Sequence, residues 1–293
     1  MTIYTSLIGG LGNQMFQYAA GRALSLRKNT ELYLDISNFD SYGMHQCFEL
    51  NRVFSYQAKI ASTTEIEELL GWQSNALIRR ILLRPELAPL RPHTFAVEPY
   101  FNYWPGINDL VTNCYLTGYW QSEKYFLDFS AQIRADFTFK LPLEKQNDEL
   151  AKQISKVNAI SLHVRRGDYA SNPKTTATHG LCTLDYYRGS INYLIERIQN
   201  PHFYIFSDEI NWVQENLKID YPCTYVKHNR GVDSYIDMHL MSLCHHHIIA
   251  NSSFSWWGAW LNPVGDKIVV APKKWFANST DVRDLLPDGW MTL

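Results

Sequence analysis

Short apolar runs alternate with amphipathic segments at the start of the chain. Residues 3–8 form an apolar run, and a glycine-rich turn at 9–12 leads into a segment whose apolar residues recur at helical spacing. Asn13 stands where its side chain can cap that helix. Residues 31–36 then have the pattern of a second strand. The pattern predicts a strand–loop–helix–strand unit at the N-terminus.

The same alternation becomes regular in the C-terminal half. Strand-like runs lie at 159–164, 202–206, 223–226, 247–250 and 267–271. Helix-like segments lie between them, at 184–198 after a capping Thr183, at 210–217 and at 234–244. Short, continuously apolar strands that alternate with amphipathic helices are typical of a doubly wound parallel sheet. The pattern therefore predicts an α/β protein whose strands are buried on both faces.

The middle of the chain, 40–135, has a less regular pattern. Residues 65–70 and 76–83 have helical spacing, and prolines separate these segments from the loops around them. The polar stretch at 144–152 is either a linker or the first turns of a helix between domains. We place a boundary at 145, which divides the chain into domains 1–145 and 146–293.

Composition narrows the choice of function without naming one. The 293 residues are 46% hydrophobic, enough for a large core, and the net charge of −2 gives no general attraction for nucleic acid. The five cysteines include no C-x-x-C pair, which argues against a disulfide framework or a zinc finger. Because the N-terminus lacks the pattern of a signal peptide and no apolar run reaches about 18 residues, we expect a soluble cytoplasmic protein.

The richest polar cluster follows the predicted strand at 159–164. It reads His163-Val-Arg-Arg-Gly-Asp-Tyr169. Ligands of open α/β sheets bind beyond the carboxyl ends of the strands, and the guanidinium of Arg165 or Arg166 can fork two phosphate oxygens. The alternative is a structural ion pair between Arg165 and Asp168, which contributes little when exposed. The density of polar groups favours a binding site.

A second cluster follows the strand at 247–250. Ser252, Ser253, Phe254 and Ser255 precede or begin a predicted helix, whose amino end and hydroxyl groups can bind phosphate. Ordinary capping is the alternative, although a single serine suffices for a cap. Asp237 is also open to two interpretations. It can complete a capping box with Ser234, or it can accept the N1 and N2 hydrogens of a guanine.

Two further motifs have weaker signals. In the N-terminal turn, Gly10 and Gly12 let backbone N–H groups approach a ligand beside Asn13, but glycines of such loops also serve turn geometry alone. The run at 245–247, together with His239, invites a zinc site. Adjacent residues do not share a face of a helix or strand, so we expect no metal and favour cationic side chains at a helix C-terminus.

Together these motifs resemble the bacterial α-1,2-fucosyltransferases of glycosyltransferase family 11. The stretches that carry the resemblance are Gly9-Gly-Leu-Gly-Asn-Gln-Met-Phe-Gln-Tyr-Ala19, Gly118-Tyr-Trp-Gln-Ser-Glu-Lys-Tyr125, His163-Val-Arg-Arg-Gly-Asp-Tyr169, Phe206-Ser-Asp-Glu209 and Ala250-Asn-Ser-Ser-Phe-Ser-Trp-Trp-Gly258. The resemblance implies a GT-B-like fold, with two Rossmann-like domains facing a central cleft. It also implies that GDP-fucose binds mostly to 146–293, that the acceptor binds mostly to 1–145, and that no metal is required.

The resemblance further implies roles for individual residues. Arg165 would meet the β-phosphate, and His163 and Asp237 the guanosine. Ser253, Phe254 and Ser255 would meet the phosphates, while Asn13 would face the fucose and the leaving oxygen. The glutamate that serves as base in α-1,6 relatives has no counterpart at 170–175. Two routes stay open, one with Asp168 as the base, and one in which Arg165 stabilises departing GDP and a phosphate oxygen takes the proton.

The expected function is therefore inverting transfer of L-fucose from GDP-fucose to the 2-hydroxyl of a terminal β-galactoside. The expected acceptor is a galactose-terminated oligosaccharide or glycolipid, such as an O-antigen at the inner face of the cytoplasmic membrane, with at most peripheral membrane association. Two alternatives remain: a transferase for another GDP-sugar or linkage, and a non-catalytic nucleotide- or glycan-binding protein. Several aromatic residues would either line a sugar cleft or pack the first domain, namely Tyr100, Phe101, Tyr103, Trp104, Tyr119 and Trp120.

Overall fold

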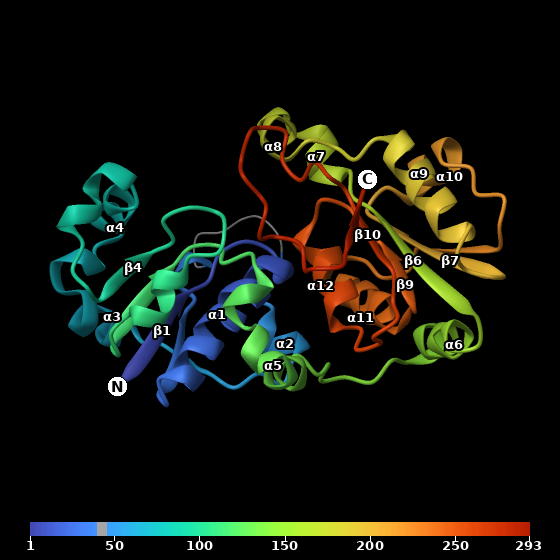
Figure 1. Ribbon diagram of the computed structural model, residues 1–293. Coiled ribbons are helices and arrows are strands. Elements are labelled where there is room, and N and C mark those ends of the chain that lie inside the picture. The colour runs from blue at the N-terminus through green and yellow to red at the C-terminus, as the bar shows by residue number, and fades with distance from the viewer. Residues whose placement is uncertain (40–45) are drawn as a thin grey trace. The chain divides into compact units, whose positions relative to one another are not determined.

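The computed structural model describes residues 1–39 and 46–293, with all their side chains except those of Ala76 and Asp168. It divides into two compact units (Figure 1). The first comprises Met1–Lys140 with Asp281–Pro287, and the second comprises Leu141–Thr280 with Asp288–Leu293. The polar stretch around the expected boundary at 145 is helix α6 (Lys145–Ile154) of the second unit. The pattern did not indicate that 281–287 returns to the first unit.

The first unit is built on a parallel sheet. Its strand order is β3 (Lys59–Ile60), β2 (Glu31–Asp35), β1 (Thr2–Ser6), β5 (Cys114–Thr117) and β4 (Phe95–Val97). The strands predicted at 3–8 and 31–36 are thereby confirmed. The chain runs from β1 outward to β3, crosses to β4 at the other edge, and ends the sheet with β5 beside β1, so the strand order switches between β1 and β5.

Helices flank the sheet of the first unit. They are α1 (Leu11–Arg27), α2 (Leu50–Val53), α3 (Thr63–Leu70), α4 (Ala76–Leu82) and α5 (Ser130–Asp136). The helices predicted at 65–70 and 76–83 are confirmed. Short 3₁₀ turns join the elements of both units, at η1 (Ser37–Phe39), η2 (Gly71–Ser74), η3 (Pro85–Leu90), η4 (Pro105–Asp109), η5 (Glu123–Tyr125), η6 (Leu127–Phe129) and η7 (Gly231–Ser234). Helices α3 and α4 pack through Ile66, Leu70 and Leu82 against strand residues Phe95 and Tyr115.

The second unit also has a parallel sheet. Its strand order is β11 (Met291–Thr292), β10 (Val269–Ala271), β9 (His246–Ile248), β6 (Asn158–Val164), β7 (Pro201–Ser207) and β8 (Cys223–Val226). The chain runs from β6 outward to β8, returns to β9, and then runs outward to β11 on the other side. This is the Rossmann order, and its switch point lies between β6 and β9. The doubly wound sheet predicted from the sequence is confirmed.

Helices cover both faces of this sheet (Figure 1). Besides α6 they are α7 (Gly167–Ser171), α8 (Pro173–His179), α9 (Leu184–Ile195), α10 (Ile210–Asn216), α11 (Tyr235–Leu243) and α12 (Ser253–Leu261). The predicted cap of α9 is confirmed, because the side chain of Thr183 accepts the Tyr186 N–H. The sequence pattern missed α7 and α8, which bury little apolar surface and therefore lack helical spacing.

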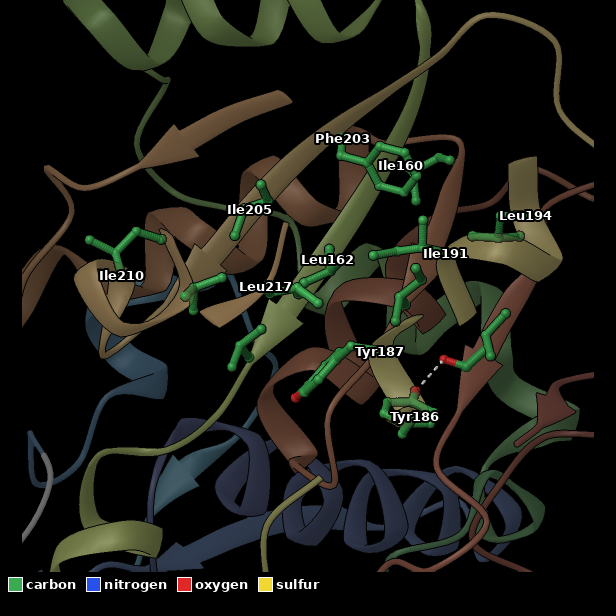
Figure 2. Close-up of a cluster of buried hydrophobic side chains, with 14 of the residues drawn as sticks. Ile160, Leu162, Tyr186, Tyr187, Ile191, Leu194, Phe203, Ile205, Ile210 and Leu217 are labelled. Atoms are coloured by element: carbon green, nitrogen blue, oxygen red, sulfur yellow. Dashed lines mark hydrogen bonds between the residues drawn. The ribbon is translucent and has the colours of Figure 1, made fainter. Parts of the chain in front are cut away.

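Strand β6 separates two cores by the alternation of its side chains. Ile160 and Leu162 point into the larger core, where they pack with Tyr187 and Ile191 of α9 (Figure 2). The opposite face of the sheet packs on α6 and α11, where Leu240 is fully buried. Because side chains alternate along a strand, His163 falls on this second face. Within the described part of the chain, no helix is long and apolar enough to span a membrane.

The second face of the sheet contains a buried histidine held by two polar partners. Nε2 of His247 lies 2.9 Å from the amide nitrogen of Asn262, which can only donate, so the ring proton lies on Nδ1. Nδ1 then donates to the Ser161 hydroxyl at 2.8 Å. Burial lowers the pKa of His247 well below its ordinary value. Burial also lowers the pKa of His163, His239 and His246 to about 4.

These histidines predict acid sensitivity of the fold. Each is neutral in the folded protein but binds a proton in the unfolded chain below about pH 6.5, so their stabilising contribution is present above that pH and is lost below it. We expect these histidines to lower the free energy of unfolding in urea between about pH 7.5 and about pH 5.5, by up to about 1.4 kcal/mol per pH unit each. Asp237 and Glu98, whose pKa values burial raises to about 7, offset part of this loss, because they gain protons in the folded protein over the same interval.

The His247→Gln variant should lose less stability over that interval than the wild-type protein. Exposed His93 provides the matched control, because His93→Gln leaves the buried network intact. A wild-type free energy of unfolding that is constant across the interval would contradict this account.

Candidate functional site

The structure brings two of the predicted clusters together at the switch point of the second unit. Strands β6 and β9 pair in parallel, with Leu162 opposite Ile248, so the residues that follow them emerge at the same edge of the sheet. One strand leads to Arg165 and the other to the start of α12. The rings of His163 and Phe254 lie 5.9 Å apart across this junction. The two clusters that the sequence analysis placed after strands thus lie at one edge of the sheet.

Arg165 has a partly exposed guanidinium that is oriented by an acidic partner. Its Nη1 lies 3.0 Å from Oδ2 of Asp208, and the exposed fraction of the Arg165 side chain is 28%. The guanidinium carbon also lies 5.4 Å from the ring centre of Tyr169. Asp208 is the partner here, whereas the sequence analysis considered Asp168 for an ion pair.

Asp208 is a site residue to which the sequence analysis assigned no role. It follows β7, the strand beside β6, so the rule of inspecting strand ends could have found it. Its Oδ1 accepts the backbone N–H of Arg166 at 3.0 Å. A Cβ atom on Gly167 would lie 2.7 Å from Oδ2, so glycine is needed for this close approach. The carboxylate thus fixes both the loop and the guanidinium of Arg165.

Arg166 makes a different set of contacts. Its Nε donates to Glu209 at 3.0 Å, and its guanidinium carbon lies 3.6 Å from the ring centre of Trp212. This packing over an aromatic ring holds the side chain on the α10 side of the loop. The two adjacent arginines therefore have different acidic and aromatic partners. A nucleotide contact of Arg166 stays a prediction.

The amino end of α12 lies at the same edge of the sheet. Ser252 is the N-cap residue, and its side chain makes no capping hydrogen bond, which does not support the simple capping interpretation. The hydroxyl of Ser255 donates back to the carbonyl of Ser252 at 3.3 Å. The first N–H groups of an α-helix point out of its amino end, where they and the helix dipole favour an anion; in α12 they belong to Ser253, Phe254 and Ser255.

His163 is buried and Asp237 is partly buried, both on the α11 side of the sheet. Burial lowers the pKa of His163 to about 4, although the charge of Asp208 opposes this shift. In the described part of the chain, Nδ1 of His163 is buried without a hydrogen-bond partner. Burial raises the pKa of Asp237 to about 7, against the opposing effects of Asn229 and Arg230. At pH 7 His163 is therefore neutral, whereas Asp237 is about half protonated.

The capping box proposed for Asp237 is wrong. No capping hydrogen bond from Ser234 is found within the described residues. Instead, Oδ1 of Asp237 accepts from the Asn229 amide at 2.8 Å, and Asn229 in turn contacts Asn147 of α6. This polar chain ties the loop after β8 to two helices. Asp237 keeps its second oxygen for another donor, as the guanine interpretation requires.

The capping role predicted for Asn13 is also wrong. Gly10 is the N-cap residue of α1, and Asn13 is already inside the first turn, where its N–H bonds to the Gly10 carbonyl at 2.9 Å. The side chain of Asn13 instead accepts from the amide of Gln121 at 2.8 Å. Gly12 lies within the same helical turn. Asn13 is thus joined to the loop after β5, at the switch point of the first unit.

Two buried glutamines, Gln14 and Gln17, hold the loops after β1 and β5 in place. Gln17 accepts the Ile8 N–H at 2.9 Å and donates to the Gly118 carbonyl at 3.0 Å, so it connects the loops after β1 and β5. Gln14 donates to the Gly9 carbonyl and accepts the Glu49 N–H, both at 2.9 Å. These contacts account for part of the Gly-Asn-Gln motif, which therefore has a structural function in this chain.

Glu98 holds the loop after β5 from the neighbouring strand end. It follows β4, and its two oxygens accept the backbone N–H groups of Tyr119 at 2.6 Å and Trp120 at 3.0 Å. Trp120 has a positive φ of 55°, a conformation that costs energy for a bulky residue. Burial raises the pKa of Glu98 to about 7, although both N–H groups favour its charged form. The sequence analysis missed Glu98 because it is an isolated acidic residue without a motif.

The aromatic residues between 100 and 125 differ in how far they are buried. Trp120 is fully buried and packs edge-on against Tyr125 at 5.3 Å. Tyr103 also contacts Tyr125, with ring centres 4.9 Å apart. Tyr100 and Tyr119 are about half exposed. Of the aromatics considered for a sugar cleft, Tyr100 and Tyr119 are therefore the exposed candidates.

Two further predictions concern Asp168 and the histidine run. Asp168 belongs to α7, and its side chain lies outside the described residues. Across residues 1–39 and 46–293, no group of three or more His, Cys, Asp or Glu side chains could hold a metal ion. In the histidine run, His246 and His247 are kept neutral by burial, so the proposed cationic role at a helix C-terminus is wrong for them.

The contacts of Glu98 predict its contribution to stability. In Glu98→Gln one oxygen is replaced by an NH₂ group that cannot accept, so the backbone N–H of Tyr119 or Trp120 loses its acceptor. We expect a loss of about 0.5–1.5 kcal/mol in the free energy of unfolding by urea. Exposed Glu86 provides the control, since Glu86→Gln should leave this free energy unchanged. Equal stability of both variants would show that Glu98 does not hold the loop.

Two Rossmann-like units, each built on a parallel sheet, give the chain a GT-B-like fold. A solved structure of the α-1,6-fucosyltransferase NodZ, soaked with GDP-fucose, matches with a TM-score of 0.56 at 14% identity. The match covers 89% of this chain and 92% of NodZ. The expectation of a central cleft between the domains stays a prediction.

The chain belongs to glycosyltransferase family 11, whose model matches residues 100–292. The α-1,2-colitosyltransferase of Escherichia coli is 38% identical over 99% of this chain and 98% of its own length. The O-antigen biosynthesis glycosyltransferase WbnK of Escherichia coli is 37% identical over 99% of this chain and 100% of its own. The galactoside α-(1,2)-fucosyltransferase 1 of Ateles belzebuth is 23% identical over 92% of this chain and 67% of its own.

Proposed function

We propose that this glycosyltransferase moves L-fucose from GDP-fucose to the 2-hydroxyl of a terminal β-galactoside, with inversion at C1 and without a metal ion. The observation that carries the donor assignment is the pairing of β6 with β9. It gives Arg165 and the amino end of α12 a common edge of the sheet. A permanent cation beside a helix amino end is suited to a diphosphate.

The nucleotide contacts follow from the positions of the other residues. The N–H groups of Ser253, Phe254 and Ser255 would bind phosphate oxygens, with Ser252 at the same turn. A buried carboxylate such as Asp237 can accept two hydrogens from a guanine edge. His163 would contact the guanosine from the same face of the sheet. In the first unit, Gly10, Gly12 and Asn13 would face the sugar and the leaving oxygen.

Transfer requires the charge of the leaving group to be balanced. The acceptor oxygen attacks C1 from the face opposite GDP, and the bond from C1 to the β-phosphate oxygen breaks with its electron pair going to GDP. Arg165 would stabilise the negative charge that develops there. The acceptor proton goes either to a carboxylate, with Asp168 the first candidate, or to a phosphate oxygen of the departing GDP.

A second donor is favoured by the relative named α-1,2-colitosyltransferase, at 38% identity. Colitose is L-fucose without its 3-hydroxyl, so the same diphosphate site would serve both donors. A pocket that hydrogen-bonds the 3-hydroxyl would reject colitose by about 10⁴-fold, whereas an apolar pocket would discriminate weakly. The name of WbnK supports an O-antigen as the acceptor. A peripheral position at the inner membrane face would suit that acceptor.

The first prediction from this proposal concerns Arg165, with Arg188 as its control. Arg165→Ala leaves the diphosphate charge unbalanced, so we expect kcat to fall about 100-fold or more. Arg188→Ala, which changes an exposed arginine of α9, is the matched control and should keep wild-type kcat. Retention of more than about a tenth of wild-type turnover by Arg165→Ala would exclude the proposed role.

The second prediction concerns donor and metal. With lactose or N-acetyllactosamine as acceptor, GDP release should proceed in EDTA with GDP-fucose, and GDP-mannose should compete weakly. GDP-colitose tested in parallel decides between the two deoxy sugars. The donor assignment would be overturned if the protein used another nucleotide sugar but neither GDP-fucose nor GDP-colitose. Saturable GDP binding without turnover across a broad acceptor panel would support the non-catalytic alternative.

A further inference from the structure

Helix α4 of the first unit has two apolar faces. One face points inward, where Ile78 and Leu82 pack on the cluster formed with α3 and the sheet. The other carries Leu77 and Ile81, which are 72% and 51% exposed. Residues four apart share a face of a helix. A surface helix ordinarily has a single apolar stripe, so this second stripe is unusual.

The outer stripe of α4 lies beside further exposed groups. Trp72 of η2, which packs against α4, is 64% exposed. Arg80 on α4 and Arg84 directly after it are exposed as well. Arg79, by contrast, points inward to Asp35 at 3.1 Å. We call Trp72, Leu77, Arg80, Ile81 and Arg84 the α4 patch; α4 lies at the outer edge of its unit (Figure 1).

The charge of this segment differs from that of the chain. Residues 71–91 contain Arg79, Arg80, Arg84 and Arg91 against Glu86, whereas the whole protein carries a net charge of −2. The exposed acids Glu67 and Glu68 belong to α3, before this segment. Cations interspersed with exposed leucine, isoleucine and tryptophan match an anionic lipid surface. There, apolar side chains enter the headgroup boundary while arginines meet the phosphates.

A second copy of the chain is a poorer occupant. In a two-fold dimer the same patch meets itself, so Arg80 and Arg84 would face the arginines of the other copy. Like charges brought together in this way oppose association. An anionic membrane offers the opposite charge, and the amphipathic indole of Trp72 suits the membrane–water interface.

We propose that the α4 patch binds the surface of an anionic membrane. The binding is peripheral, because α4 has seven residues and its inner face belongs to the core. It is independent of catalysis, because the patch shares no residue with either switch point. It would concentrate the enzyme at a lipid-linked acceptor.

Vesicle sedimentation tests this proposal. Full-length protein is mixed with vesicles of about three parts phosphatidylcholine to one part phosphatidylglycerol, and with pure phosphatidylcholine vesicles. Binding should favour the anionic vesicles and weaken as salt is added. Arg80→Ala and Arg84→Ala should each weaken it about fivefold. The double change Leu77→Ser with Ile81→Ser should weaken it at least about tenfold.

Matched controls separate the patch from general surface effects. Leu127→Ser changes a leucine that is 51% exposed elsewhere in the first unit, and Arg188→Ala changes an exposed arginine of the second. Both should bind anionic vesicles like the wild-type protein. All patch variants should keep wild-type turnover on a soluble acceptor, so failure of this proposal is distinguishable from failure of the proposed function.

Three results would overturn the proposal. Equal binding to anionic and neutral vesicles would remove the role of charge. Wild-type binding by all the patch variants would place the membrane contact elsewhere. A wild-type dimer that becomes a monomer in Leu77→Ser with Ile81→Ser, without vesicle binding, would show that a second copy covers the patch.

Discussion

The parallel pairing of β6 with β9 is the constraint on which the candidate donor site depends. These strands are far apart in sequence, yet their hydrogen-bonded register fixes where the chain leaves each of them. The loop after β6 carries the guanidinium of Arg165, and the segment after β9 leads to the amino end of α12. Neither feature is specific for phosphate alone. Held at a common edge, they provide a fixed positive region before any ligand arrives, as a diphosphate site requires.

Much of the polar sequence around both switch points serves to hold backbone in place. Asp208 binds a loop N–H while it orients Arg165, Glu98 binds two N–H groups, and Gln17 joins the loops after β1 and β5. These hydrogen bonds are part-buried or exposed, and each contributes about 0.5–1.5 kcal/mol to the stability of the loop that it holds. Motifs that mark the family are therefore partly structural, and only some of their members are available to a substrate.

The sequence predicted the sheets well because strand and helix periods depend on local burial, which is visible in the order of residues. It also predicted that Arg165 and the serine turn each follow a strand, and such strand ends share an edge in a parallel sheet. The sequence analysis was wrong about two side chains that bond to residues outside the expected cap. The side chain of Asn13 bonds to Gln121 and does not cap its helix. The side chain of Asp237 bonds to Asn229 and does not form the predicted capping box with Ser234. Such choices depend on tertiary proximity, which no local pattern encodes.

The most direct test of this account is a crystal structure of the protein with bound GDP. We predict that the diphosphate lies within hydrogen-bonding distance of the Arg165 guanidinium and of the first-turn N–H groups of α12, with the guanine edge on Asp237. A diphosphate bound away from both the arginine and the helix amino end would contradict the account.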